Sequence, residues 1–315
     1  MSRDNSIGKI SIVVPVCERV EHTLKNYHEY RSAVEALGQD FELIYAINSQ
    51  FSDIADALRD IAKGDNHLKL LELSRNYGEG TVLQAAFDHV TGDTTLILPP
   101  YKQVELQELT KMFEALKTAD LVLATRSPRL DSKFKQTQTR VFSKLMERLS
   151  NQKYSDAGCH VRLMRTQVAK ELNLYGDQHR FLPLLAYELG YISVEVELKQ
   201  APENVARGQH KPGVYLRRML DLLTIVFLTK FNKKPLRFFG ILGTSSMAIG
   251  FLGLVYITYE RLFLDIGMAD RPLLVLMSLF LVLGIQLIGI GLIGETIIFT
   301  HTEQNKEYRI KQILN

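Results

Sequence analysis

The sequence predicts an α/β domain with a mostly parallel sheet, followed by amphipathic helices at a membrane surface and two transmembrane helices. Two observations support this fold class. Over the first 124 residues, short β-branched apolar runs alternate with helical patterns, which is typical of a parallel sheet covered by helices on both faces. The last third of the chain then carries two long runs without a charged residue.

The predicted strands are short apolar runs bounded by polar or turn-forming residues. They cover residues 10–16, 41–47, 68–73, 94–98 and 121–124. Helical patterns fill the intervals at residues 21–36, 52–62, 80–90 and 106–117. Ligands of open parallel sheets bind beyond the carboxyl ends of the strands. The expected site therefore comprises four segments: residues 15–19, 47–50, 74–78 and 98–103.

Composition excludes several classes of protein. The net charge of +3 is too small to indicate a nucleic-acid-binding protein. Cys17 and Cys159 form neither a CxxC pair nor a metal-ligand spacing, which indicates a reducing compartment. The polar residues 1–5 are followed by no apolar core of a signal peptide, so we expect no cleaved leader.

Each uncharged run is long enough to cross a bilayer. The runs cover residues 238–259 and 272–294, and at 1.5 Å per residue each spans about 30 Å, the thickness of a hydrocarbon core. A pair of buried helices in a soluble domain is the alternative. Small residues in both runs predict close helix packing. Glu295, just past the second run, either extends toward the interface or serves as a proton relay.

Basic residues flank the two runs on the side of the chain's ends. They are Lys230, Lys233, Lys234, Arg237, Lys306, Arg309 and Lys311. The connecting loop carries two arginines against three acidic residues. The positive-inside rule then places the α/β domain and both termini in the cytoplasm. We expect a two-span protein of the cytoplasmic membrane.

The segment before the first run is amphipathic. Residues 214–231 repeat apolar side chains at helical spacing with charges between them, as in a helix that lies in the headgroup plane. A surface helix packed on the α/β domain is the alternative. The predicted organisation is an α/β domain at 1–205, an interfacial region at 206–237, two membrane helices at 238–299 and a cytoplasmic tail at 300–315.

Seven segments carry a resemblance to a known family. They are ISIVVPV at 10–16, LSRNYGEG at 73–80, FDHVTGD at 87–93, DAGCHVRLMR at 156–165, HRFLPLLA at 179–186, KPLR at 234–237 and GIQLIGIGLIGE at 284–295. Taken in this order, the chain resembles the family-2 polyprenyl-phosphate glycosyltransferases, of the dolichyl-phosphate mannose synthase and undecaprenyl-phosphate glucosyl- or aminoarabinose-transferase type.

The resemblance implies a fold, a reaction and partners. It implies a GT-A nucleotide-sugar domain that transfers a sugar from a nucleotide sugar to a polyprenyl phosphate at the cytoplasmic face of a membrane. It also implies contact with membrane lipids and a homo-oligomer, usually a tetramer. Members hold Mg²⁺ or Mn²⁺ on an Asp-x-Asp pair. Carried over to this chain, the donor-binding residues are Pro15, Glu18, Asn48, Asn76 and Gln103.

The donor side departs from the family pattern. The Asp-x-Asp-x-Gln motif falls on Pro99, Tyr101 and Gln103, so both metal-binding carboxylates are absent and we expect no metal at these positions. The Asp-Asp-Gly-Ser segment after the second strand reads Ile-Asn-Ser-Gln at 47–50, and Glu79 stands where the family has lysine.

The reacting and acceptor sides keep more of the pattern. The resemblance makes Asp156 the candidate base and Arg162 an anion clamp, although a structural ion pair between the two is the alternative. His160, between them, is a candidate substitute for lost chemistry or a structural histidine. The acceptor phosphate is assigned to Arg207, His210 and Lys211, with a merely basic loop as the alternative.

Two functional hypotheses remain open. The first is a membrane-anchored glycosyltransferase with an unusual or metal-independent donor mode. The second is a pseudoenzyme, a catalytically inactive subunit that binds lipid phosphate or forms a hetero-complex with an active membrane enzyme. The retained Asp156, Arg162, Arg207 and Lys211 favour the first hypothesis, and the loss of the metal pair beside an intact membrane region favours the second.

Overall fold

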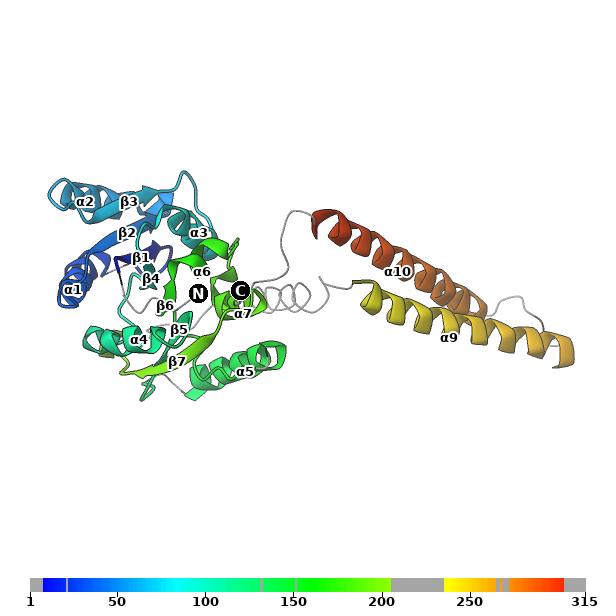
Figure 1. Ribbon diagram of the computed structural model, residues 1–315. Helices are drawn as coiled ribbons and strands as arrows, with labels where there is room; N and C mark the ends of the chain where they lie inside the picture. The colour runs from blue at the N-terminus through cyan, green and yellow to red at the C-terminus, as the bar shows by residue number, and fades with distance from the viewer. Residues whose placement is uncertain are drawn as a thin grey trace, which may run out of the picture. The chain divides into compact units, whose positions relative to one another are not determined.

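The chain forms two compact units. The computed structural model describes residues 8–20, 22–130, 133–150, 152–204, 235–264, 267 and 272–302 (Figure 1). The described part of the first unit ends at residue 204, and the second unit contains the helices that follow.

The first unit is built on a seven-stranded sheet of order β3-β2-β1-β4-β6-β5-β7. All neighbours are parallel except β6, which runs antiparallel to β4 and β5. The strands are β1 (Ile10–Val16), β2 (Phe41–Ile47), β3 (Leu68–Glu72), β4 (Thr94–Ile97), β5 (Leu121–Arg126), β6 (Arg162–Arg165) and β7 (Ser193–Leu198). The prediction of a mixed α/β fold with a mostly parallel sheet is confirmed.

Helices cover both faces of the sheet (Figure 1). One layer contains α1 (Thr23–Glu35), α2 (Ser52–Ala62) and α4 (Leu109–Leu116). The other contains α3 (Glu79–His89), α6 (Thr166–Glu171), α7 (Leu182–Glu188) and, packed on α7, α5 (Lys133–Ser150). The short 3-10 helices are η1 (Ser49–Phe51), η2 (Leu106–Glu108), η3 (Gln178–Phe181) and η4 (Pro202–Asn204).

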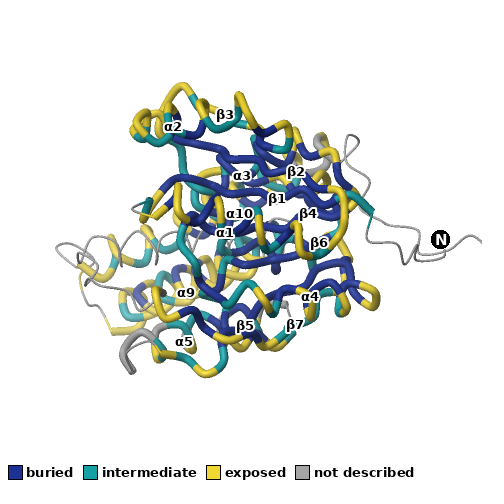
Figure 2. Tube along the Cα trace, turned by 90° about the vertical axis from the view of Figure 1, so that its left-hand side faces the viewer, coloured by how far each residue is buried: buried dark blue, intermediate teal, exposed yellow. Residues whose placement is uncertain are grey.

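The central strands are buried along their whole length. Every residue of β1, β2 and β4 is buried, as the dark blue tube in Figure 2 shows. Strands covered by helices on both faces need apolar side chains on both faces. This explains why β1 and β2 read as continuous apolar runs rather than as alternating patterns.

Two strands were not predicted. β6 is only four residues long, with the sequence RLMR, and charged residues at both ends hide it from a search for apolar runs. β7 has the alternating sequence SVEVEL and lies at the edge of the sheet, where only one neighbour pairs with it. The five predicted strands are all present within one residue at each end, except that β5 extends two residues further.

The second unit is a pair of long apolar helices, α9 (Pro235–Leu264) and α10 (Pro272–Thr302). By length and composition, residues Pro235–Leu264 and Pro272–Ile297 could each cross a membrane, with mean hydropathies of 1.8 and 2.7. Both helices begin with a proline, whose missing N–H costs nothing in a first helical turn.

Small residues bring the two helices together. A Cβ atom on Gly243 would lie 2.7 Å from the carbonyl oxygen of Gly284, and one on Gly250 would lie 2.7 Å from the carbonyl oxygen of Met277. The hydroxyl of Ser246 donates to the carbonyl of Phe280 at 2.8 Å. The close packing predicted from the small residues is confirmed.

Glu295 accepts a hydrogen bond from the backbone N–H of Leu236 at 3.3 Å, and its two predicted roles stay predictions.

Several predictions fall outside the described residues. These are the interfacial helix at 214–231, the acceptor residues Arg207, His210 and Lys211, and the basic residues beyond 302. The domain boundaries at 205 and 300, and the membrane orientation, also stay predictions.

Candidate active site

Two asparagines join the loops that follow β2 and β3. Asn48 accepts a hydrogen bond from the backbone N–H of Tyr77 at 3.1 Å and donates to the carbonyl of the same residue at 2.9 Å. Asn76 accepts from the backbone N–H of Gln50 at 3.0 Å. Both side chains lie at the predicted edge of the sheet, and both have protein partners there. Their role in donor binding stays a prediction.

The end of β1 supplies Arg19, which lies in the predicted site segment 15–19 but was given no role of its own. Pro15 is buried within β1, and Glu18 is exposed just beyond it. Arg19 has a φ of 56°, a left-handed conformation that is uncommon for residues other than glycine. Its guanidinium carbon lies 3.8 Å from the centre of the Tyr101 ring, which is a cation–π distance.

The positions of the expected Asp-x-Asp pair hold no metal ligand. The carbonyl of Pro99 accepts a hydrogen bond from the hydroxyl of Tyr30 at 2.7 Å. Burial raises the pKa of Tyr101, and nearby Glu79 raises it further, so the phenol stays neutral. The residues present therefore do not fit the Mg²⁺ or Mn²⁺ that the resemblance implies at these two positions.

Gln103 organises the loop that precedes β6. Its side-chain oxygen accepts the backbone N–H of His160 at 2.7 Å and the thiol of Cys159 at 3.5 Å, while its amide nitrogen donates to the Tyr101 hydroxyl at 3.1 Å. Burial raises the pKa of the Cys159 thiol to about 11, so it stays protonated. Gln103 thus positions residues 159 and 160 beside the end of β4.

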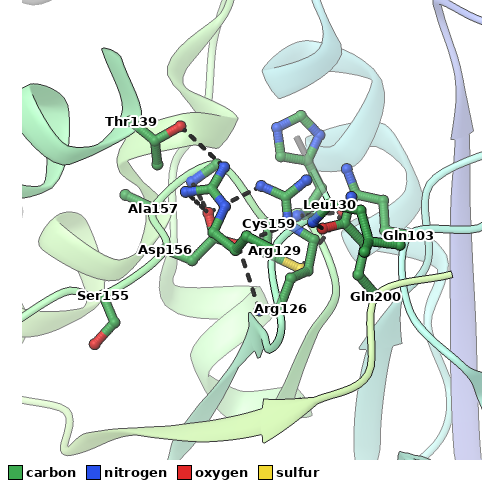
Figure 3. A network of polar contacts seen from close by, with 12 residues as sticks. Gln103, Arg126, Arg129, Leu130, Thr139, Ser155, Asp156, Ala157, Cys159 and Gln200 are labelled. Carbon is green, nitrogen blue, oxygen red and sulfur yellow. Dashed lines mark hydrogen bonds and ion pairs between the residues drawn. The ribbon is translucent and has the colours of Figure 1, made fainter. Parts of the chain in front are cut away.

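Asp156 forms a bidentate ion pair with an arginine from the end of β5 (Figure 3). Arg126 Nε lies 2.6 Å from one carboxylate oxygen and Nη2 lies 2.9 Å from the other, and Arg129 approaches to 3.5 Å. Burial alone would raise the pKa of Asp156, but the hydrogen bonds and charge of Arg126 outweigh it and lower the pKa. Asp156 therefore pairs with Arg126 rather than with Arg162, and the alternative of an Asp156–Arg162 ion pair is wrong.

The assignments of Asp156 as a base and of Arg162 as an anion clamp stay predictions. As a base, Asp156 would take a proton while it accepts two hydrogen bonds from Arg126. Arg162 is buried in β6 and donates to the carbonyl of His179, while its Nε has no hydrogen-bond partner among the described residues. Burial lowers the pKa of Arg162 to about 10, so it still carries a positive charge at neutral pH.

Three side chains of metal-ligand type meet close to Arg162. Glu79 Oε1 lies 3.7 Å from His160 Nδ1, and Glu79 Oε2 lies 3.4 Å from His179 Nε2. The two imidazole rings contact edge to face, with centroids 5.2 Å apart. His160 was predicted as part of the site, whereas His179 was not singled out. No local pattern marks His179, because its partners come from segments 19 and 100 residues away.

Two glycines bring Glu79 and His179 together. A Cβ on Gly78 would lie 2.4 Å from the carbonyl oxygen of Gly176, and one on Gly80 would lie 2.8 Å from the same oxygen. The backbone N–H of Gly80 donates to that carbonyl at 2.8 Å. The turn before η3 therefore rests against the first turn of α3, which places Glu79 next to His179.

Burial controls the charge of this cluster. It raises the pKa of Glu79 to about 7, although the positive charges of Arg180 and Arg162 oppose the shift. Burial lowers the pKa of His160 and of His179 well below the usual value, and the same two arginines add to both shifts. Both imidazoles are therefore neutral near pH 7, and Glu79 exchanges a proton in the same range.

The chain matches the family model described as glycosyl transferase family 2 over residues 11–172. This region is just over half of the chain and includes β1 to β6. The chain belongs to glycosyl transferase family 2.

The chain is similar to several solved structures. Glucosyl-3-phosphoglycerate synthase from Mycobacterium tuberculosis, in complex with Mn²⁺ and UDP-glucose, is 14% identical, with 70% of this chain and 78% of that chain covered and a TM-score of 0.48. The mannosyltransferase PcManGT from Pyrobaculum calidifontis, in complex with GDP-Man and Mn²⁺, is 14% identical, with 95% and 76% covered and a TM-score of 0.47. A mycobacterial protein is 15% identical, with 69% and 74% covered and a TM-score of 0.51, a likeness of fold.

Proposed function

We propose that this chain is a membrane-anchored family 2 glycosyltransferase that moves a sugar from a nucleotide sugar to a polyprenyl phosphate. The observation that carries the proposal is the combination of a family 2 α/β unit with two helices long and apolar enough to span a membrane. An acceptor with a long apolar tail resides in a bilayer, so an enzyme that uses it benefits from an anchor there.

The charges of the described site support an anionic donor. Arg19, Arg162 and Arg180 belong to the segments that meet near Glu79 and Tyr101. Guanidinium groups stabilise the charge that develops on a leaving diphosphate. In this proposal they supply part of the stabilisation that the two missing carboxylates and their metal would otherwise give. Arg207, His210 and Lys211 bind the acceptor phosphate, and Asp156 assists its attack.

The second candidate is a non-catalytic subunit that binds lipid phosphate and associates with an active membrane enzyme. One observation favours it: Pro99 and Tyr101 offer no carboxylate, and Arg19 covers the ring of Tyr101. A divalent ion at a diphosphate leaving group contributes several kcal/mol in general, and its loss at these positions is large enough to abolish turnover.

The test uses the full chain in vesicles that contain undecaprenyl phosphate. Radiolabelled UDP-, GDP- and CDP-sugars are added with and without Mn²⁺, and label in the lipid extract is measured. Lipid-linked label with one donor, and a large loss of it in Lys211→Ala, supports transfer. If a folded protein transfers no label to lipid from any donor, the proposal of sugar transfer is overturned. Co-purification of the untagged native protein with another membrane enzyme then supports the second candidate, and isolation as a homo-oligomer alone overturns that one.

A further inference from the structure

Glu79, His160 and His179 come from three separate segments and meet at one point. Glu79 begins α3, His160 lies in the loop before β6, and His179 belongs to η3. One potential ligand atom from each lies within 4.8 Å of the other two. Their side chains are 16%, 18% and 3% exposed, so the cluster is largely buried but still reachable from solvent.

The two ring nitrogens of His179 are poorly satisfied by hydrogen bonds among the described residues. His179 Nε2 accepts a long hydrogen bond from Arg180 Nε at 3.4 Å, so it carries a lone pair, which a metal ion would take over from Arg180. His179 Nδ1 is buried without a partner among the described residues. With the proton on Nδ1, the lone pair of Nε2 and an oxygen of Glu79 face each other at 3.4 Å. Two electron-rich atoms at that distance repel unless a positive ion or a proton lies between them.

We infer that Glu79, His160 and His179 together bind one divalent transition-metal ion of the Zn²⁺ or Mn²⁺ kind. Two neutral imidazoles and one carboxylate form a ligand set that suits borderline first-row ions, whereas Mg²⁺ and Ca²⁺ require mostly oxygen ligands. Ligands about 2.0 to 2.2 Å from a tetrahedral ion lie about 3.3 to 3.6 Å from one another. The two Glu79–histidine distances, 3.4 Å from one carboxylate oxygen and 3.7 Å from the other, are close to this range, and one ligand atom from each residue lies within 4.8 Å of the other two.

This site differs from the Asp-x-Asp position, where Pro99 and Tyr101 supply no ligand. Glu79 stands where the family pattern has lysine, so one change both removes a cation from this region and adds a carboxylate. Three protein ligands leave coordination positions open for water or substrate oxygens, as in catalytic metal sites.

The nearby arginines define what completes the coordination shell. The charges of Arg162 and Arg180 reach Glu79 and oppose a bare cation. An anionic oxygen ligand neutralises that repulsion, so a nucleoside diphosphate strengthens metal binding. This second step rests on the proposed function, whereas the metal site itself does not.

The test measures metal directly on the full chain, purified in detergent with any polyhistidine tag removed. Chelator-treated protein is incubated with Zn²⁺, Mn²⁺ or Mg²⁺, freed of unbound ion, and analysed by mass spectrometry for metal per chain. Co²⁺ serves as a spectroscopic probe, because its visible absorption reports the ligand set. We expect one Zn²⁺ or Mn²⁺ per chain and no retained Mg²⁺.

Three variants and one control decide the assignment. Glu79→Gln, His160→Gln and His179→Gln each weaken binding by about 100-fold or more, since loss of an outer-shell partner alone costs about 10- to 100-fold. His89→Gln, an exposed histidine at the other end of α3, leaves it unchanged. If buried His179→Gln does not fold, the partly exposed Glu79→Gln variant decides. No retained ion in the parent chain, or equal retention in folded Glu79→Gln, overturns the site. Sugar transfer is assayed separately, so either proposal can fail alone.

Discussion

Two carboxylates in the same unit, one completely and one largely buried, behave in opposite ways. Asp156 is completely buried, accepts two hydrogen bonds from Arg126 and has a lowered pKa. Glu79 is largely buried, has no short hydrogen bond from a cation among the described residues, and has a pKa raised to about 7. Both side chains are at most 16% exposed, but only Asp156 has an arginine as its partner in the described part of the chain. A carboxylate that is paired with a buried guanidinium stays ionised, whereas one without such a partner is available for a proton or an ion.

The change with the greatest expected effect removes the paired carboxylate, Asp156. Asp156→Ala leaves the buried guanidinium of Arg126 without its carboxylate, and we expect a loss of about 3–5 kcal/mol in the free energy of unfolding. The chain has no tryptophan, so circular dichroism of the full chain follows unfolding.

The matched control for this prediction is an exposed ion pair. Arg59→Ala removes contacts with Asp56 and Glu72 on the surface, and we expect a change within about 1 kcal/mol. A loss for Asp156→Ala no larger than that of Arg59→Ala would contradict a large contribution of the Asp156–Arg126 ion pair to stability.

Replacing the unpaired carboxylate should have the opposite sign. In chelator-treated protein at pH 8, Glu79→Gln removes a buried charge whose pKa is raised from 4.5 to about 7, and we expect a gain of about 1–3 kcal/mol in stability. A raised pKa gives stability that is present below pH 4.5 and is lost as pH rises through 7. The gain should therefore shrink at pH 5. Thermal unfolding at the two pH values measures it, and a variant less stable than the parent at pH 8 contradicts it.

A third change disturbs the backbone that creates the cluster. In Gly80→Ala the new methyl would lie 2.8 Å from the Gly176 carbonyl oxygen, so the turn before η3 must shift. We expect a loss of about 1–3 kcal/mol in stability together with weaker metal retention. Gly64→Ala is the control, because its methyl would lie 3.7 Å from the nearest atom. Equal metal retention in the two variants would show that the approach of Gly176 is not what positions His179.

The weakest expected effect is the loss of stability at acid pH that comes from protonation of Asp156. The folded-state pKa of Asp156 is lowered from 3.8, so its contribution is present above that pH and is lost as pH falls through the folded value. Below pH 4 this one group contributes a slope of at most about 1.4 kcal/mol per pH unit. Asp156→Asn should have a flatter acid limb in pH-dependent unfolding, and an unchanged slope would contradict the pairing with Arg126.

The parallel part of the fold could be predicted because burial on both faces makes β1 and β2 nearly continuous apolar runs. β6 could not, since its four residues begin and end with arginine and become a strand only through pairing with β4 and β5. The location of Asn48 and Gln103 beyond the strand ends could be predicted because parallel strands end at one edge of the sheet, whereas their role in donor binding stays a prediction.

The pairings within the site depend on tertiary structure. Asp156 lies 30 residues from Arg126, and which of several arginines it would meet cannot be derived from spacing. His179 approaches Glu79 only because glycines at 78 and 80 allow their backbone to touch the carbonyl of Gly176. A sequence pattern reports periodicity and local capping, and neither property records such a contact.

The contact between Gly243 and Gly284 has a mechanical consequence for the second unit. Where two glycine backbones touch, no acyl chain fits between the helices, and neither helix can slide along the other without losing the Ser246 bond to Phe280. In a bilayer, α9 and α10 would therefore tilt together as a single body.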